Sequence, residues 1–273
     1  MTPARWALTA LVALTVTGCG AAQGADRPTP PPVENLPDGV VVDYQLGGGY
    51  APAAGVGGVV RDSTDRPAEG LYSICYVNAF QTQPDESDDW LADHPALVLH
   101  LDGAPVTDPG WPGELLLDTS TEQNRWRIAE LVGARVQECA ARGFDAVELD
   151  NLDSYTRSSG LLTQDDALAV ARRLIATAHT AGLAVGQKNA AELAVEGHSA
   201  GFDFAVAEEC HRWDECAAYT DVYGDAVIAV EYADDLRGTF ADACTDPDTP
   251  ASTVLRDRAL IPAGWPGHVF DAC

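Results

Sequence analysis

The chain has 273 residues, 46% of them hydrophobic, and 42 acidic side chains against 16 Lys and Arg give a formal net charge of −26. This size and hydrophobic content allow a large buried core, as one α/β barrel or as two smaller domains, and exclude a disordered chain. The charge makes nucleic acid an unsuitable partner, because binding phosphate backbones needs clustered Lys and Arg. Cationic or neutral ligands suit it better, although acidity alone also keeps secreted proteins soluble.

Residues 1–18 are predicted to be a bacterial lipoprotein signal peptide. Arg5 supplies a positive start, and residues 6–16 form an apolar run that is too short to span a bilayer as a helix. Residues 16–19, Val-Thr-Gly-Cys, resemble a lipobox, in which the cysteine receives a lipid and becomes the new N-terminus. An ordinary signal peptide with an incidental Cys19 is the alternative. We expect a secreted protein whose only membrane contact is this lipid, at the extracellular face of the cell membrane.

Residues 19–39 are predicted to be the lipidated cysteine and a tether, because they are rich in Pro, Gly and Ala and lack periodicity. The folded domain is expected to span residues 40–273. Within it, eight short runs rich in Val, Ile and Ala are predicted to be strands. They cover residues 40–46, 56–62, 71–80, 114–120, 145–151, 183–189, 203–210 and 226–232.

Two segments with helical periodicity, residues 124–142 and 163–181, each lead directly into a strand. The second has Thr163 as its N-cap and ends before Gly182. Strands that alternate with helices pair in parallel, and eight of them match the size of a single (β/α)8 TIM-like barrel. An open doubly wound sheet is the alternative, but neither of the common glycine-rich nucleotide-binding motifs is present.

Apart from Cys19, the chain has six cysteines, and an exported chain with an even number is expected to form disulfides. We predict that Cys210 pairs with Cys216 as a local staple and that Cys244 pairs with Cys273 at the C-terminus. Cys75 with Cys139 then follows by elimination. No C-x-x-C or clustered histidines accompany these residues, so we expect no metal site and no cofactor.

Polar side chains gather at the last residues of the predicted strands. The C-terminal strand ends of a parallel barrel meet on one side and form the mouth of the active site. In the strand 145–151, Glu148 and Asp150 share one face, whereas Val147 and Leu149 share the other. A second acid across the mouth would complete the pair of carboxyl groups that glycoside cleavage requires.

Six motifs occur in the order and with the kind of spacing typical of glycoside hydrolase family 114, the endo-α-1,4-polygalactosaminidases and their bacterial relatives. They are CYVNAF, WPGELLLD, GFDAVELDNLDSY, GQKN, FDFAVAEECHRWDEC and AVEY. The resemblance covers residues 40 to about 235. It implies a TIM-like barrel that cleaves α-1,4-linked galactosamine polymers within the chain, using two carboxylates and no obligatory metal.

Matching the family's motifs, Asp150 in VELDN and Glu208 in FAVAE take the positions of the catalytic carboxylates. The resemblance implies that Asp150 is the nucleophile or base and Glu208 the general acid, with neighbouring Glu209 as the alternative to Glu208. Burial by the apolar run 204–207 is expected to raise the pKa of Glu208. The chain departs from the family at Ala207, where Asn is common, and at Tyr44 and Gln45, where Trp is common.

Further residues at strand ends, or in the loops that follow them, are predicted to bind the sugar. The substrate is expected to be a cationic amino-sugar polymer and the protein a monomer. A non-catalytic carbohydrate-binding lipoprotein, or a glycosidase for another hexosamine or a neutral α-glycan, are the alternatives. Lys188 could instead serve only as an ion-pair partner. The ten candidates are Tyr44, Asn78, Glu148, Asn151, Asp153, Tyr155, Lys188, Asn189, Glu231 and Tyr232.

Overall fold

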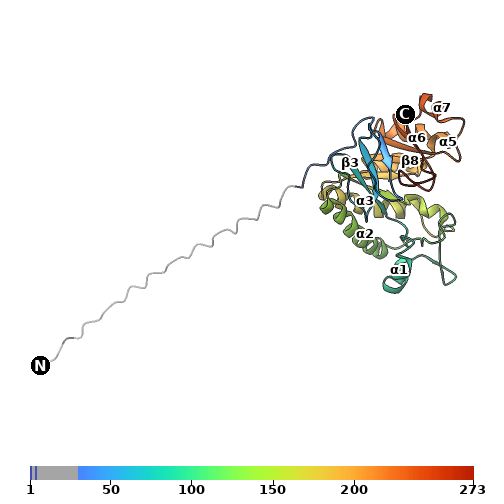
Figure 1. Ribbon diagram of the computed structural model, residues 1–273. Helices are drawn as coiled ribbons and strands as arrows, with labels where there is room; N and C mark the ends of the chain where they lie inside the picture. The colour runs from blue at the N-terminus through green and yellow to red at the C-terminus, as the bar shows by residue number, and fades with distance from the viewer. Residues whose placement is uncertain (2–3, 5–29) are drawn as a thin grey trace.

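The computed structural model describes residues 30–273 together with Met1 and Ala4 (Figure 1). Within residues 30–273, eight parallel strands form a nearly closed TIM-like barrel in one domain, as predicted. A short final strand, β11 (Phe270–Ala272), adds to its edge in the antiparallel direction. The parallel strands are, in order around the sheet, β1 (Val42–Tyr44), β2 (Gly58–Asp62), β3 (Tyr72–Asn78), β6 (Ala146–Asp150), β7 (Ala184–Lys188), β8 (Phe204–Glu208), β9 (Val227–Tyr232) and β10 (Ser252–Arg256).

A buried ion pair joins the first and last parallel strands, where the backbone ladder stops. Arg256 on β10 donates to the carboxylate of Asp43 on β1 at 2.8 Å and also to the backbone carbonyl of Tyr44. The Arg256 side chain is fully buried. Because an unpaired buried guanidinium is costly, this contact favours the arrangement in which β1 and β10 lie next to each other.

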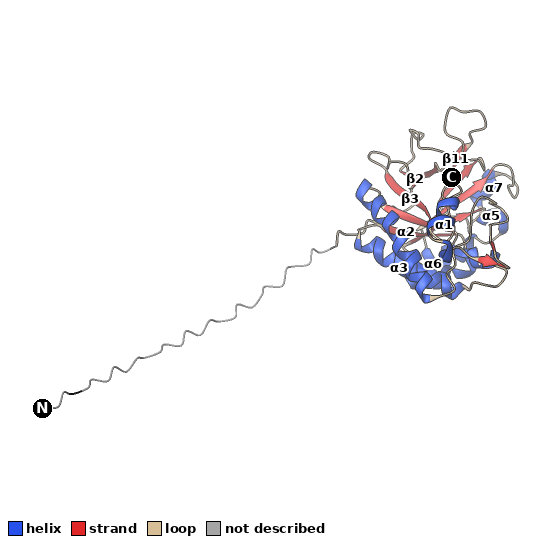
Figure 2. Cartoon of the chain, turned by 90° about the horizontal axis from the view of Figure 1, so that it is seen from below, coloured by secondary structure: helices blue, strands red, loops and turns tan. Residues whose placement is uncertain are grey.

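The longer helices lie together on one side of the barrel (Figure 2). The two predicted helices are present as α2 (Glu122–Arg142), capped by Thr121, and α3 (Gln164–Thr180), whose N-terminus has a capping box of Thr163 and Asp166. They pack against each other. The shorter helices are α1 (Ser87–Asp93), α4 (Ala194–Ala200), α5 (Cys210–Trp213), α6 (Cys216–Tyr223) and α7 (Phe240–Thr245), with 3-10 turns η1 (Pro95–Leu97), η2 (Leu152–Arg157) and η3 (Ala191–Leu193).

Seven of the eight expected strands are present, but the one predicted over 114–120 is wrong. Its leucines are buried beneath the loops after β3, where residues 115–117 make isolated bridges to Gln81, Val98 and Thr107. A two-residue hairpin of β4 (His100–Leu101) and β5 (Ala104–Pro105) lies nearby. The eighth parallel strand of the barrel is instead β10, which was not predicted from the sequence.

The core has two layers, as a barrel requires. One lies inside the sheet, and the other lies between the sheet and the helices. Part of the expected tether belongs to the inner layer: Leu36 is buried against it, and Glu34 accepts a hydrogen bond from Tyr72 through its carbonyl. The ordered domain therefore starts before residue 40. The predicted signal peptide and Cys19 lie outside residues 30–273, and no helix in that part of the chain is long and apolar enough to cross a membrane.

Three disulfides link the cysteines in the pairs expected from the sequence. Cys75 on β3 is bonded to Cys139 on α2, so this bond fastens a barrel strand to an outer helix. Another bond, between Cys244 and Cys273, fastens the C-terminal residue to α7. The third joins Cys210 and Cys216, only six positions apart.

Candidate active site

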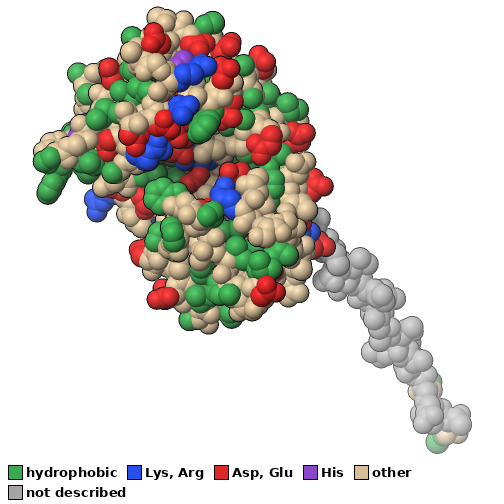
Figure 3. Space-filling model, turned by 90° about the vertical axis from the view of Figure 1, so that its right-hand side faces the viewer, with side chains coloured by type: hydrophobic (Ala, Val, Ile, Leu, Met, Phe, Trp, Pro, Cys, Tyr) green, Lys and Arg blue, Asp and Glu red, His purple; other side chains and the backbone are tan. Residues whose placement is uncertain are grey.

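A cleft of about 470 Å³ opens at the C-terminal ends of the strands. Figure 3 shows a hollow on one face of the molecule in which acidic and basic side chains gather. Five acids and two bases are among the residues lining the cleft, so the wall is predominantly acidic. These charged residues are Asp62, Glu114, Asp150, Glu208, Glu209, Lys188 and Arg258.

Lys188, at the end of β7, stands at the centre of the charged groups. Its ammonium lies 3.2 Å from Glu148 Oε1, 3.5 Å from Asp150 Oδ1 and 3.1 Å from Glu208 Oε2. It also donates to the Tyr44 hydroxyl at 3.0 Å, and the Tyr44 hydroxyl in turn donates to Glu148 at 2.6 Å. Lys188 is the only lysine in the sequence, a signal that could have marked it in advance.

Asp150 and Glu208 are each held by a tyrosine from the neighbouring strand of the sheet. Tyr76 on β3 donates to Asp150 Oδ2 at 2.6 Å, and Tyr232 on β9 donates to Glu208 Oε1. Asn189 adds a hydrogen bond from its amide to Glu208 Oε2 at 3.0 Å. The two carboxylates are therefore fixed in position, as catalytic groups must be.

The chain turns in the same way after three of the strands that carry these groups. Asn151, Asn189 and Glu209 follow β6, β7 and β8, and all three adopt positive φ angles, of 65°, 49° and 59°. Asn tolerates this left-handed region, whereas for Glu it is an uncommon conformation. The sharp turn places the last side chain of each strand at the mouth. After β6 it also lets the backbone amide of Asn151 donate to Asp150 Oδ1 at 2.8 Å.

Burial and the neighbouring groups together shift the pKa values of Glu148 and Glu208 in opposite directions. Burial raises the pKa of Glu148 to about 7, against the lowering effect of Lys188. Burial also acts to raise the pKa of Glu208, but Lys188 and the hydrogen bonds from Tyr232 and Asn189 outweigh it, so the pKa lies below its usual value. The raised pKa expected for Glu208 is therefore wrong for the free protein. The pKa of Lys188 lies well above its ordinary value, because the surrounding carboxylates outweigh the effect of burial.

Contact with one ammonium limits the separation of the two carboxylates. Asp150 Oδ1 lies 3.5 Å and Glu208 Oε2 lies 3.1 Å from Lys188 Nζ, so these two oxygens are at most about 6.6 Å apart. Retaining glycosidases place their carboxyl groups about 5 to 5.5 Å apart, whereas inverting enzymes leave about 6.5 to 9.5 Å for a water molecule. This upper limit includes the spacing of retaining enzymes and only reaches the lower end of the inverting range.

Of the twelve predicted catalytic and binding residues, six line the cleft and three lie directly behind it. Behind the lining, Glu148 contacts Lys188, Asn189 contacts Glu208, and Asn78 accepts a hydrogen bond from Asn151 at 2.9 Å. The lining residues are Tyr44, Asp150, Asn151, Lys188, Glu208 and Tyr232.

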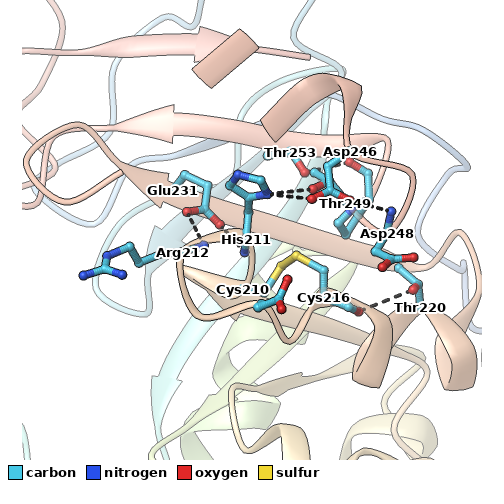
Figure 4. The surroundings of a disulfide bond; sticks show 12 residues. Cys210, His211, Arg212, Cys216, Thr220, Glu231, Asp246, Asp248, Thr249 and Thr253 are labelled. Atoms are coloured by element: carbon cyan, nitrogen blue, oxygen red, sulfur yellow. Dashed lines mark hydrogen bonds and ion pairs between the residues drawn. A yellow bond between two sulfur atoms is a disulfide. The ribbon is translucent and has the colours of Figure 1, made fainter. Parts of the chain in front are cut away.

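The other three, Asp153, Tyr155 and Glu231, do not line the cleft. Asp153 forms an ion pair with Arg157, and Tyr155 donates to Glu192 at 2.6 Å. Glu231 accepts hydrogen bonds from backbone amides at the start of α5, beside the Cys210–Cys216 disulfide (Figure 4). Side chains alternate along β9, so Tyr232 faces the cleft and Glu231 faces away from it.

Several lining residues were missed as site residues, among them Tyr76, which donates to Asp150, and three others. Trp111 and Glu114 belong to the WPGELLLD motif and come from the loop before α2, whereas Arg258 follows β10 and forms an ion pair with Glu209 at 2.8 Å. Ala207 is fully buried in the layer between sheet and helices. The departure from Asn at this position therefore removes no amide from the cleft.

The barrel and its paired carboxylates define a glycoside hydrolase. The model of glycoside-hydrolase family GH114 matches residues 22–273, so the chain belongs to this family. Aspergillus fumigatus Ega3, in a crystal structure with galactosamine, has a similar fold, with a TM-score of 0.68 and 23% identity over 93% of this chain and 100% of that one. The glycoside hydrolase domain of PelA from Pseudomonas aeruginosa is also similar, with a TM-score of 0.54 and 16% identity over 85% of this chain and 99% of that one. A comparison with curated proteins gave no match.

Proposed function

We propose that this protein is an endo-acting hydrolase of α-1,4-linked galactosamine polymers. The observation that carries the proposal is the contact of Asp150 and Glu208 with the single ammonium of Lys188 on the wall of the cleft. The acidic lining and the net charge of −26 suit a polymer that bears free amines. The similarity to a structure that contains galactosamine supports the same substrate class.

We assign Asp150 as the nucleophile and Glu208 as the acid and base of a double displacement. The Asp150 carboxylate attacks the anomeric carbon while Glu208 gives its proton to the departing glycosidic oxygen. Water, deprotonated by Glu208, then breaks the ester between the sugar and Asp150, which returns both groups to their initial state. Two inversions at one carbon give a product with the same anomeric configuration as the substrate.

The substrate and the stereochemistry are tested together. The protein is incubated with α-1,4-linked galactosamine polymer, its N-acetylated form and a neutral α-glucan, and reducing ends and chain lengths are measured. Proton NMR during the first minutes reads the anomer released. We expect internal cleavage of the galactosamine polymer and an α-anomer first. Binding of the polymer without new reducing ends would instead indicate a carbohydrate-binding lipoprotein, and a β-anomer would contradict the double displacement.

Lipid anchoring at Cys19 is proposed from the sequence of residues 1–19. Two acyl signals or one with further contacts give stable attachment, and each buried methylene contributes about 0.8 kcal/mol. In a bacterial host, the intact chain is expected in the membrane fraction and accessible to protease added outside. Cys19→Ala is expected to abolish incorporation of labelled fatty acid. Labelling that persists in Cys19→Ala would refute this anchor.

A further inference from the structure

The loop that carries the WPGELLLD motif forms one wall of the cleft but has no part in the reaction described above. Two of its side chains, Trp111 and Glu114, line the cleft. Trp111 is 63% exposed, whereas Glu114 is only 8% exposed. An exposed aromatic ring next to a buried acid is the combination that a site for an amino sugar requires, because the ring packs against the apolar face of the sugar and the acid binds the amine.

The backbone of Trp111 is held by Asp108, which also forms an ion pair with Arg157. Asp108, which is buried, accepts hydrogen bonds from the backbone amides of Gly110 at 2.8 Å and Trp111 at 3.2 Å. Arg157 lies 2.5 Å from the other oxygen of Asp108, and Gln81 donates to the same oxygen at 2.8 Å. The turn that presents the exposed ring is thus fixed by interactions beneath it. A ring that is already positioned loses little conformational entropy when a sugar binds to it.

Glu114 is linked to the end of β6, which carries Asp150, by the hydrogen bonds of two side-chain amides. Asn78 donates to Glu114 Oε2 at 2.9 Å, and Asn151, the residue after Asp150, donates to Asn78 at 2.9 Å. Among residues 30–273, Glu114 Oε1 has no hydrogen-bond partner. Burial raises the pKa of Glu114 to about 7, with Asp150 and Asp108 adding to the effect and Asn78 and Arg157 opposing it. A nearly buried carboxylate with one free oxygen at the cleft is suited to receive a cation.

We propose that Trp111 and Glu114 form a subsite for one 2-amino sugar residue of the polymer, adjacent to the bond that is cleaved. The sugar ring lies against Trp111, and its ammonium group donates to Glu114 Oε1. This subsite rests on the proposed function and makes it more specific, because it selects sugars with a free amine over N-acetylated ones. An acetamido group is neutral and leaves the negative charge of Glu114 without a partner.

The test compares Trp111→Ala and Glu114→Gln with two matched controls on the outer helix α2. Trp126→Ala removes a tryptophan with a similar exposed fraction, 58%, and Glu130→Gln neutralises an exposed glutamate. Steady-state kinetics at pH 7, where about half of Glu114 is ionised and the sugar amine is still largely protonated, are measured with free-amine and N-acetylated α-1,4-galactosamine oligosaccharides. Glutamine keeps an oxygen that accepts from Asn78, so the loop is expected to remain folded, and thermal unfolding checks this.

Glu114→Gln is expected to raise KM about tenfold for the free-amine oligosaccharide, the loss of one charge-assisted hydrogen bond, and less than twofold for the N-acetylated one. Trp111→Ala is expected to raise KM for both, and the controls for neither. Equal changes of Glu114→Gln on both substrates, or no change in Trp111→Ala, would overturn the subsite. If the wild-type protein cleaves neither substrate, the proposed function fails. In that case, calorimetry measures the affinity of each variant for the same oligosaccharides. The subsite is supported if the affinities change in the pattern expected above for KM, and it is overturned if they do not.

Discussion

Replacing Lys188 by methionine tests the electrostatics of the site most severely. The substitution keeps much of the side-chain volume but removes the only cation within 3.5 Å of Glu148, Asp150 and Glu208 among residues 30–273. Removing one partner of a buried charge pair costs about 3 to 5 kcal/mol, because the remaining charges stay buried without compensation. A domain of this kind has a free energy of unfolding of about 5 to 15 kcal/mol. Lys188→Met is therefore expected to fold but to lose a large part of its stability.

The loss of stability should depend on pH. Without the ammonium, which lowers the pKa values of Glu148 and Glu208, the pKa values of these two acids in the folded state are expected to rise above those in the unfolded state. Acids with raised pKa values are neutral in both states at low pH, and they destabilise the fold increasingly as the pH rises from the unfolded to the folded pKa values. The difference between Lys188→Met and wild type is therefore expected to be smaller at pH 4.5 than at pH 7.5.

Urea unfolding followed by tryptophan fluorescence at these two pH values measures the difference. The control is Arg127→Met, which removes an exposed ion pair with Glu130 and is expected to cost less than about 1 kcal/mol. If Lys188→Met lies within about 1 kcal/mol of wild type at both pH values, the reasoning that this cation stabilises the three acids is wrong.

Three further changes have defined outcomes. Glu148→Gln removes a group whose pKa is raised by burial to about 7, so the variant should gain about 3 kcal/mol relative to wild type between pH 4.5 and pH 7.5, and parallel stability curves would contradict this. Replacing both Cys75 and Cys139 by alanine opens a loop of 64 residues and should lower the free energy of unfolding by about 4 kcal/mol in urea titrations, whereas an unchanged midpoint would show that the bond contributes little. Lys188 and the hydrogen bonds that Glu208 accepts outweigh burial and keep the pKa of Glu208 low. Because the acid must be protonated to act, kcat/KM should rise as the pH falls below 7. A kcat/KM that rises toward pH 8 would argue against Glu208 as the acid.

The local pattern of apolar and polar residues in the sequence was sufficient to predict most of the barrel. The helices α2 and α3 have clear periodicity and threonine caps, and seven strands have the apolar runs that a buried parallel sheet needs. The run 114–120 has the same composition but is buried beneath loops, since burial alone does not determine whether a segment pairs with the sheet. The strand β10 was not predicted because its serine, threonine and arginine are polar, although all three are buried in the structure.

For the site, the sequence located the strand ends but not the partners of each side chain. Asp150 and Glu208 lie far apart in the chain, and both contact Lys188 in the structure. Asp153 and Tyr155 belong to a turn whose side chains face Arg157 and Glu192 rather than the cleft, which depends on the path of η2. The low pKa of Glu208 depends on Lys188, a contact between strands that no local pattern contains.

The most direct test of the account compares reducing-end release from α-1,4-linked galactosamine polymer by wild type, Asp150→Asn and Glu208→Gln. Each variant replaces a carboxylate by an amide of the same shape, and thermal unfolding of each protein shows whether the fold is retained. Glu130→Gln serves as the control for loss of an acid remote from the cleft. The account predicts a loss of at least about a hundredfold in kcat for both cleft variants and none for the control. Near wild-type cleavage by either folded cleft variant would contradict the assignment of these two carboxylates.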